Sequence, residues 1–185
     1  FGLKYCNLSL NNFPREFMDR TICMIAVRKD GENLRYIPDE LKDEEMCMTA
    51  ILKASTCLSW VPKGLKNKEI CTIAFNKNNS TLRFIPDEFK DKEMCMNAVT
   101  YAGYLLEFVP EELKDKEMCT IALRDNKVFK FVPDKYKDKE MCRSAVKYED
   151  NLKYVPEELK DKEMCKDAII NCGDNLQYVP NKDKE

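Results

Sequence analysis

Seven cysteines recur at one position along the chain, each nine residues after a proline: Cys23, Cys47, Cys71, Cys95, Cys119, Cys142 and Cys165. Thiolates bind zinc or pair as disulfides, so this column is the strongest candidate for chemistry. Zinc sites bring two cysteines together at a spacing of about two to four residues, whereas these occur once per 23 or 24. Neighbouring helices about 8 to 10 Å apart also exceed the roughly 4.4 to 6.8 Å Cα separation of a disulfide. We expect buried free thiols in a structural core.

Paired carboxylates are a second candidate, because two of them can act as general acid and base. Glu111 and Glu112 stand beside Lys114, and similar pairs recur beside Lys90 and Lys160, which is typical of a solvated edge of alternating charges. The chain has no histidine, which excludes Ser-His-Asp and Cys-His pairs. It has five glycines and no G-x-G-x-x-G or P-loop motif. We expect no catalytic residues, no metal and no cofactor, and hence a protein that is not an enzyme.

The elements that carry these residues repeat. Prolines recur at intervals of 24, 24, 24, 24, 23, 23 and 24 residues: Pro14, Pro38, Pro62, Pro86, Pro110, Pro133, Pro156 and Pro180. A fixed period in this range is the signature of an array in which each unit buries its apolar face against its neighbours. We expect residues 1–185 to be a single array and part of a longer one. Residues 1–14 read as a divergent partial unit, and 181–185 as the start of a further unit.

Each unit opens with an expected α-helix. Five residues after each proline stands Asp or Asn, whose side chain can cap the first turn: Asp43, Asn67, Asp91, Asp115, Asp138 and Asp161. Apolar residues then follow at helical spacing, and the alanine three after each cysteine, such as Ala98 and Ala122, allows neighbouring helices to approach closely. Gly31, Gly103 and Gly173 lie where a left-handed residue would end a helix of about 11 to 13 residues.

A second segment in each unit carries leucine, an aromatic and a β-branched residue before the proline, as in Leu106, Phe108 and Val109. Proline disfavours the α conformation in the residue before it, so this pattern predicts one or two helical turns that end near Val109, then a turn. Two short helices per unit make the chain an all-α solenoid of about seven units. The alternative is an α/β horseshoe of the leucine-rich-repeat kind, with L-x-F-V-P as a short strand.

These residues resemble a known family of short tandem repeats with the pattern Leu-x-aromatic-(Val/Ile)-Pro-x-x-Leu-Lys-x-Lys-Glu-(Met/Ile)-Cys-x-x-Ala. Residues 152–165, LKYVPEELKDKEMC, match it almost letter for letter. The resemblance covers about residues 34–180 and departs at the start, where Asn12 replaces the aromatic residue and Thr21 the glutamate. The family is one of unknown function, found in bacteria and large DNA viruses, and has no assigned catalytic residues. The resemblance therefore implies the repeat and no chemistry.

The positions that vary between units are the candidate partner-binding residues, since the residues that recur in each unit are expected to maintain the fold. They lie near the end of the first helix or just after it, at Lys53, Lys77, Tyr101, Tyr104, Arg124, Lys147 and Tyr148. Exposed aromatic residues supply contact area at low entropic cost. We therefore expect a scaffold for protein–protein interaction or assembly, with a protein partner of unknown identity.

Two other functions stay open at this point. One is a structural component packed into a larger particle or filament, with possible self-assembly. The other is one-base-per-repeat RNA recognition, which a formal net charge of −2 does not favour. The chain has no apolar run long enough to cross a membrane. We expect a location in the cytoplasm or another reducing intracellular compartment, or inside an assembled particle.

Overall fold

In the computed structural model, residues 9–180 are described. They contain α-helices and 3-10 helices and no β-strand, which confirms the all-α repeat and leaves the leucine-rich-repeat alternative without support. The chain divides into two compact parts, Phe1–Lys90 and Asp91–Glu185. The partial unit expected at 1–14 lies partly outside the described residues, and that expected at 181–185 lies wholly outside them.

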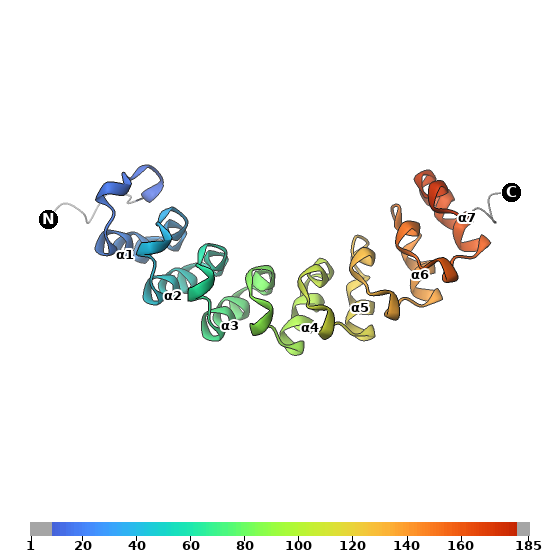
Figure 1. The fold of residues 1–185 in the computed structure, drawn as a ribbon, viewed down its shortest axis with the longest axis horizontal. Helices are drawn as coiled ribbons and strands as arrows, with labels where there is room; N and C mark the ends of the chain where they lie inside the picture. The colour runs from blue at the N-terminus through green and yellow to red at the C-terminus, as the bar shows by residue number, and fades with distance from the viewer. Residues whose placement is uncertain (1–8, 181–185) are drawn as a thin grey trace. The chain divides into compact units, whose positions relative to one another are not determined.

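Seven α-helices follow one another through the described residues (Figure 1). The Phe1–Lys90 part contains α1 (Arg20–Lys29), α2 (Glu44–Lys53) and α3 (Lys68–Lys77). The Asp91–Glu185 part contains α4 (Lys92–Tyr101), α5 (Lys116–Ala122), α6 (Lys139–Ala145) and α7 (Lys162–Asn171). An Asp or Asn side chain caps each of them; the Asp43 carboxylate, for example, accepts from the Met46 N–H at 2.8 Å. The predicted caps at Asn67, Asp91, Asp115, Asp138 and Asp161 have the same geometry.

Two 3-10 helices lie between consecutive α-helices, where the sequence predicted one short helix and a turn; after α7 the described residues contain η15 alone. The first of each pair precedes the proline: η3 (Gly31–Tyr36), η5 (Ser55–Trp60), η7 (Asn79–Phe84), η9 (Gly103–Phe108), η11 (Phe129–Phe131), η13 (Asn151–Tyr154) and η15 (Gly173–Tyr178). The second follows it: η2 (Arg15–Phe17), η4 (Asp39–Leu41), η6 (Lys63–Leu65), η8 (Asp87–Phe89), η10 (Glu111–Leu113), η12 (Asp134–Tyr136) and η14 (Glu157–Leu159). Before them, η1 covers Leu10–Asn12. The segments stay short because the residue before each proline is extended, as at Val109 (φ −86°, ψ 127°).

The α-helices are shorter than expected, and glycine does not end them. They span ten residues, or seven in α5 and α6, and α1, α2, α3, α4 and α7 end at an extended residue such as Asp30 (φ −144°). No described glycine has a positive φ, so the prediction of left-handed caps at Gly31, Gly103 and Gly173 is wrong. A Cβ on Gly31 would lie 2.6 Å from the Ala50 oxygen of α2, so this glycine allows neighbouring units to approach.

The core runs through the units as columns of equivalent side chains. The seven repeat cysteines are buried, and so are the alanines three residues after them, Ala98 and Ala122 among these. The helices α2, α3 and α7 each pack on a 3-10 helix of their own unit and one of the preceding unit, as α2 does on η5 and η3. No α-helix of residues 9–180 is long and apolar enough to cross a membrane.

Candidate partner-binding surface

A column of lysines, each four residues after a repeat proline, joins neighbouring units within each of the two compact parts. The ammonium groups donate to the main-chain oxygen of the aromatic residue in the next unit, as Lys42 does to Trp60 at 2.8 Å and Lys114 to Phe131 at 3.0 Å. Lys66, Lys137 and Lys160 make the equivalent bond. The solvated edge expected from the sequence is therefore only half right. The carboxylates are exposed, but the lysine side chains beside them, including those of Lys90, Lys114 and Lys160, are only 4–6% exposed.

A second column joins the N-terminal ends of the α-helices. The first residue of α4 is Lys92, whose ammonium lies 2.6 Å from the Asp115 carboxylate that caps α5. In the same way Lys116 reaches Asp138 at 2.7 Å, and Lys139 reaches Asp161 at 2.7 Å. Each of these cap carboxylates thus accepts from a backbone N–H and from a cation of the preceding unit. Two roles on one side chain explain why Asp recurs at the cap position.

Sequence reasoning missed a third set, made of buried asparagines. Asn175 in η15 accepts from the Leu152 N–H at 3.2 Å and donates to the Ala168 oxygen at 2.9 Å. Asn33 and Asn151 are also buried and donate to the equivalent helix carbonyl. The recurrence of Asn five residues before a proline was a signal that could have identified them. Cys57, Thr81, Leu105 and Val128 occupy this position in the units between.

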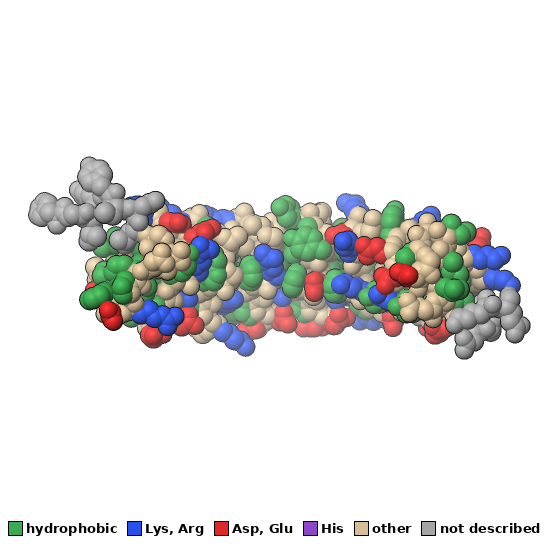
Figure 2. Space-filling model, turned by 90° about the horizontal axis from the view of Figure 1, so that it is seen from above, with side chains coloured by type: hydrophobic (Ala, Val, Ile, Leu, Met, Phe, Trp, Pro, Cys, Tyr) green, Lys and Arg blue, Asp and Glu red, His purple; other side chains and the backbone are tan. Residues whose placement is uncertain are grey.

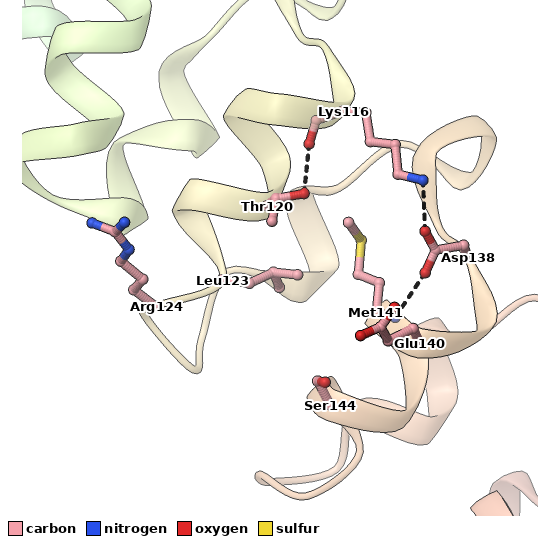
Figure 3. A pocket seen from close by; sticks show the side chains of 8 residues that line it. All are labelled: Lys116, Thr120, Leu123, Arg124, Asp138, Glu140, Met141 and Ser144. Carbon is pink, nitrogen blue, oxygen red and sulfur yellow. Dashed lines mark hydrogen bonds and ion pairs between the residues drawn. The ribbon is translucent and has the colours of Figure 1, made fainter.

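The surface is hollowed between α5 and α6. A groove of about 460 Å³ is lined by Thr120 and Leu123 on one side and Met141 and Ser144 on the other. In Figure 3 the Leu123 and Met141 side chains face one another across it. A second hollow of about 300 Å³ shares Leu123 and Ser144 with the first and extends to Lys147 and Tyr148. Together they form one continuous surface, here called the α5–α6 groove.

The groove lies where the units are one residue shorter. The sequence predicted that these units lose their residue in surface turns at 124–128 and 147–151. The structure has turns there, and α5 and α6 end three residues earlier than the ten-residue helices. The residues that would form a last helical turn in other units, Arg124 and Lys147 among them, instead stand at the rim of the groove.

At one end of the groove, the closed end, the charged side chains are paired with one another, and at the other, the open end, they are exposed. At the closed end the hydrogen bond from Lys116, followed by that from the Met141 N–H, lowers the pKa of the Asp138 carboxyl. The Lys139 contact likewise lowers the pKa of Asp161. At the open end Arg124 extends from the turn after α5, away from α6 (Figure 3). Arg124, Lys147 and Tyr148 are exposed there, and their polar groups are available to a partner.

Three of the seven predicted partner-binding residues therefore line one surface: Arg124, Lys147 and Tyr148. Tyr101 and Tyr104 belong to the same part of the chain and are 66% and 41% exposed, but they do not line the groove. Lys53 and Lys77 lie at the ends of α2 and α3 in the other part. Lys77 already donates to the Leu52 oxygen at 2.6 Å, so its ammonium is partly used within the fold. Leu123, Met141 and Phe129 were not singled out from the sequence.

The cysteine column offers no chemistry at this surface. Burial raises the pKa of Cys47, Cys71, Cys119 and Cys142 to about 11, so these thiols are protonated near neutral pH. Across residues 9–180 no three Cys, Asp or Glu side chains are grouped so that they could hold a metal ion. Cys172, which caps the end of α7, is half-buried.

The fold and this surface define a tandem helical-repeat protein with a groove between two of its units. The chain belongs to the family described as a domain of unknown function, DUF4116, whose pattern matches residues 2–42, 19–66, 43–90, 91–137 and 138–184. Each match spans about two units, and together they confirm the family resemblance in the sequence. No curated protein and no solved structure is significantly similar to the chain.

Proposed function

We propose that the chain is a non-catalytic scaffold whose α5–α6 groove binds a segment of a partner protein. The observation that carries the proposal is the combination of an apolar floor and an ionic rim. The partly exposed Leu123 forms the floor over the buried side chains of Met141 and Phe129, and Arg124 and Lys147 stand at the rim. Protein interfaces combine these features, with an apolar centre inside a polar, solvent-accessible border.

Tyr148 adds a second feature that suits a polypeptide. Its side chain is 47% exposed beside Lys147, at the end of the groove that extends past Ser144. Tyrosine and arginine are the residue types that contribute most often to the energetic centre of an interface. Tyr101 and Tyr104 are further exposed aromatic side chains on the same part of the chain, outside the groove.

The distribution of charge favours a protein over RNA as the ligand. Figure 2 shows Lys and Arg side chains interspersed with Asp and Glu over most of the visible face, with acidic side chains gathered along its lower edge. The formal net charge of the chain is −2. Nucleic-acid binding needs a continuous basic surface, because contacts with phosphates supply most of the affinity.

The proposal is tested by capture from a nuclease-treated lysate of cells that produce the protein. The baits are the wild-type chain, the double variant Arg124→Glu with Lys147→Glu, and a control, Lys162→Glu with Lys166→Glu. The control reverses two exposed charges on α7, outside the groove. We expect the wild type and the control to retain the same one or two proteins and the groove variant to lose them. Equal capture by all three baits would contradict the proposal.

A second candidate function, incorporation into a larger assembly, is favoured by one exposed leucine. Leu176 in η15 is 56% exposed, whereas the equivalent Leu106 and Leu152 are fully buried. In this candidate function a second copy of the chain covers it as those leucines are covered. If so, the purified chain should self-associate with rising concentration in light scattering, and Leu176→Lys should prevent it. A monomer at every concentration would count against this candidate.

A further inference from the structure

One lysine of the inter-unit column differs from the rest in its surroundings. In five units the ammonium also pairs with a carboxylate one residue after the proline, at 2.5–2.8 Å: Lys42 with Asp39, Lys90 with Asp87, Lys114 with Glu111, Lys137 with Asp134 and Lys160 with Glu157. Lys66 donates to the main-chain oxygen of Phe84 at 2.7 Å, as other lysines of the column donate to the equivalent oxygen. The position of its carboxylate is occupied by Lys63.

The same unit has lost its other carboxylates around this position. The segment Pro62-Lys-Gly-Leu-Lys-Asn stands where other units have sequences such as Pro38-Asp-Glu-Leu-Lys-Asp. Gly64 thus replaces a glutamate, and Asn67 replaces the aspartate of the helix cap while keeping the cap hydrogen bond. Three acidic side chains are absent from the unit, although its backbone follows the others in η6 and α3.

The space beside Lys66 is open. A hollow of about 530 Å³ is lined by Lys63, Lys66, Arg83 and Lys90, together with Asp87 and Glu88. A Cβ on Gly64 would meet no atom within 4 Å, and Gly64 does not have a positive φ, so neither packing nor backbone conformation requires glycine there. The hollow has four basic and two acidic side chains, of which Asp87 is already paired with Lys90.

We propose that the hollow between Lys63 and Lys66 is a binding site for a carboxylate, supplied by an acidic side chain of a partner protein. The other units show the arrangement that the ligand would complete: an ammonium with one bond to a main-chain oxygen and a second to a carboxylate. An ammonium has three N–H donors, so Lys66 can donate to a carboxylate as well as to the main-chain oxygen of Phe84. Lys63 and Arg83 add charge of the sign that attracts a carboxylate.

The electrostatics of Lys66 agree with this assignment. Burial lowers the pKa of its ammonium, which means that its surroundings disfavour the charged form. A bound carboxylate would reverse that effect, because an opposite charge within about 4 to 6 Å favours ionisation. The protein nature of the ligand rests on the proposed function, whereas the preference for a carboxylate rests only on Lys66 and its surroundings.

The site is tested with a peptide taken from the chain's own pattern. The probe is acetyl-Ile-Pro-Asp-Glu-Phe-amide, with acetyl-Ile-Pro-Asn-Gln-Phe-amide as the neutral analogue. The readout is the side-chain NMR signal of Lys66 in lysine-labelled full chain, assigned through Lys66→Arg. We expect a saturable shift with the acidic peptide and none with the neutral one. The use of an isolated peptide separates this test from the capture experiment on the α5–α6 groove, so that either can fail alone.

Two variants test whether the missing internal carboxylate causes the response of Lys66. Lys63→Asp should restore the internal pair of the other units, abolish the shift at Lys66 and leave the melting temperature no lower than that of wild type. Asp87→Lys should create a second vacant position, so that the Lys90 signal begins to respond to the acidic peptide. Equal shifts with both peptides, a response that persists in Lys63→Asp, or no shift at millimolar peptide would overturn the proposal.

Discussion

The Lys114 ammonium donates to the main-chain oxygen of Phe131, 3.0 Å away in the next unit, while its side chain is only 4% exposed. The bond therefore ties two units together through a group that water reaches poorly. A buried carbonyl that loses its partner costs roughly 1 to 3 kcal/mol. In a repeat array each unit contacts only its neighbours, so a broken link of this kind weakens an interface between units and not just one turn.

Lys114→Met should accordingly lower the free energy of unfolding by about 1 to 3 kcal/mol, since methionine keeps the apolar stem but not the donor. Urea denaturation followed by circular dichroism measures the change. The matched control is Lys116→Met, two residues along, where the lysine is 61% exposed and its pair with Asp138 is a surface ion pair that contributes little to stability. Equal losses in the two variants would mean that the inter-unit bond of Lys114 contributes no more to stability than the exposed Lys116 pair.

Two glycines should respond differently to the same substitution. Gly31→Ala places a Cβ 2.6 Å from the Ala50 oxygen and 2.9 Å from the Lys53 Cβ, so α2 must move away from η3. We expect a loss of about 1 to 3 kcal/mol, the usual range for overpacking. Gly64→Ala meets no neighbouring atom and should be neutral or slightly stabilising. Thermal melting measures the effect in both variants. An unchanged melting temperature in Gly31→Ala would contradict the close approach described for α2 and η3.

The helix caps predict a dependence of stability on acid. The contacts with Lys92, Lys116 and Lys139 lower the pKa of Asp115, Asp138 and Asp161 in the folded chain below the roughly 3.9 of an unfolded aspartate. The folded chain therefore binds fewer protons than the unfolded chain in acid. Its stability should be fully present above about pH 4 and should fall as the pH drops below that value.

Asp138→Asn tests this dependence at one cap, because asparagine can still accept from the Met141 N–H but cannot ionise. We expect a shallower fall in melting temperature between neutral and acidic pH than in the wild type. The control is Asp174→Asn in η15, an exposed aspartate outside the cap column. If both variants followed the wild-type curve, the cap carboxylates would not be the source of the acid sensitivity.

The cysteine column should behave as a set of small buried side chains. Cys119 is fully buried and burial raises the pKa of its thiol to about 11, so a polar hydroxyl in its place is unfavourable. Cys119→Ser should therefore destabilise the chain more than Cys119→Ala, by a margin that urea denaturation resolves. In native protein near neutral pH, Cys172 should react with a thiol reagent faster than Cys119. The opposite order would mean that Cys119 is accessible.

The sequence predicted the parts of the fold that depend on local patterns. Asp43 and its equivalents identified the start of each α-helix, because a cap depends on residues within one turn. The end of the helix was predicted wrongly, since Gly31 was read through its backbone freedom although its role is to make room for Ala50 of the next unit. Likewise Lys114 looked solvated beside Glu111, because the carbonyl of Phe131 that it bonds lies 17 residues away.

The candidate surface was predictable in the same partial way. Arg124, Lys147 and Tyr148 stood out because these positions vary between units, and the structure brings them to one groove. The apolar floor of Leu123 and Met141 did not stand out, because their repeat positions have the pattern of core residues. The groove appears only when two shortened helices, α5 and α6, are placed side by side, and that placement depends on tertiary packing.

The most direct test of the scaffold proposal is photocrosslinking from position 148 in nuclease-treated lysate. A benzophenone amino acid replaces Tyr148 at the rim of the groove, and a second chain carries it in place of Lys166 on α7 as the control. The proposal predicts that position 148 crosslinks one or two proteins that position 166 does not. The same products from both positions, or crosslinks at position 148 only to copies of the chain itself, would contradict it.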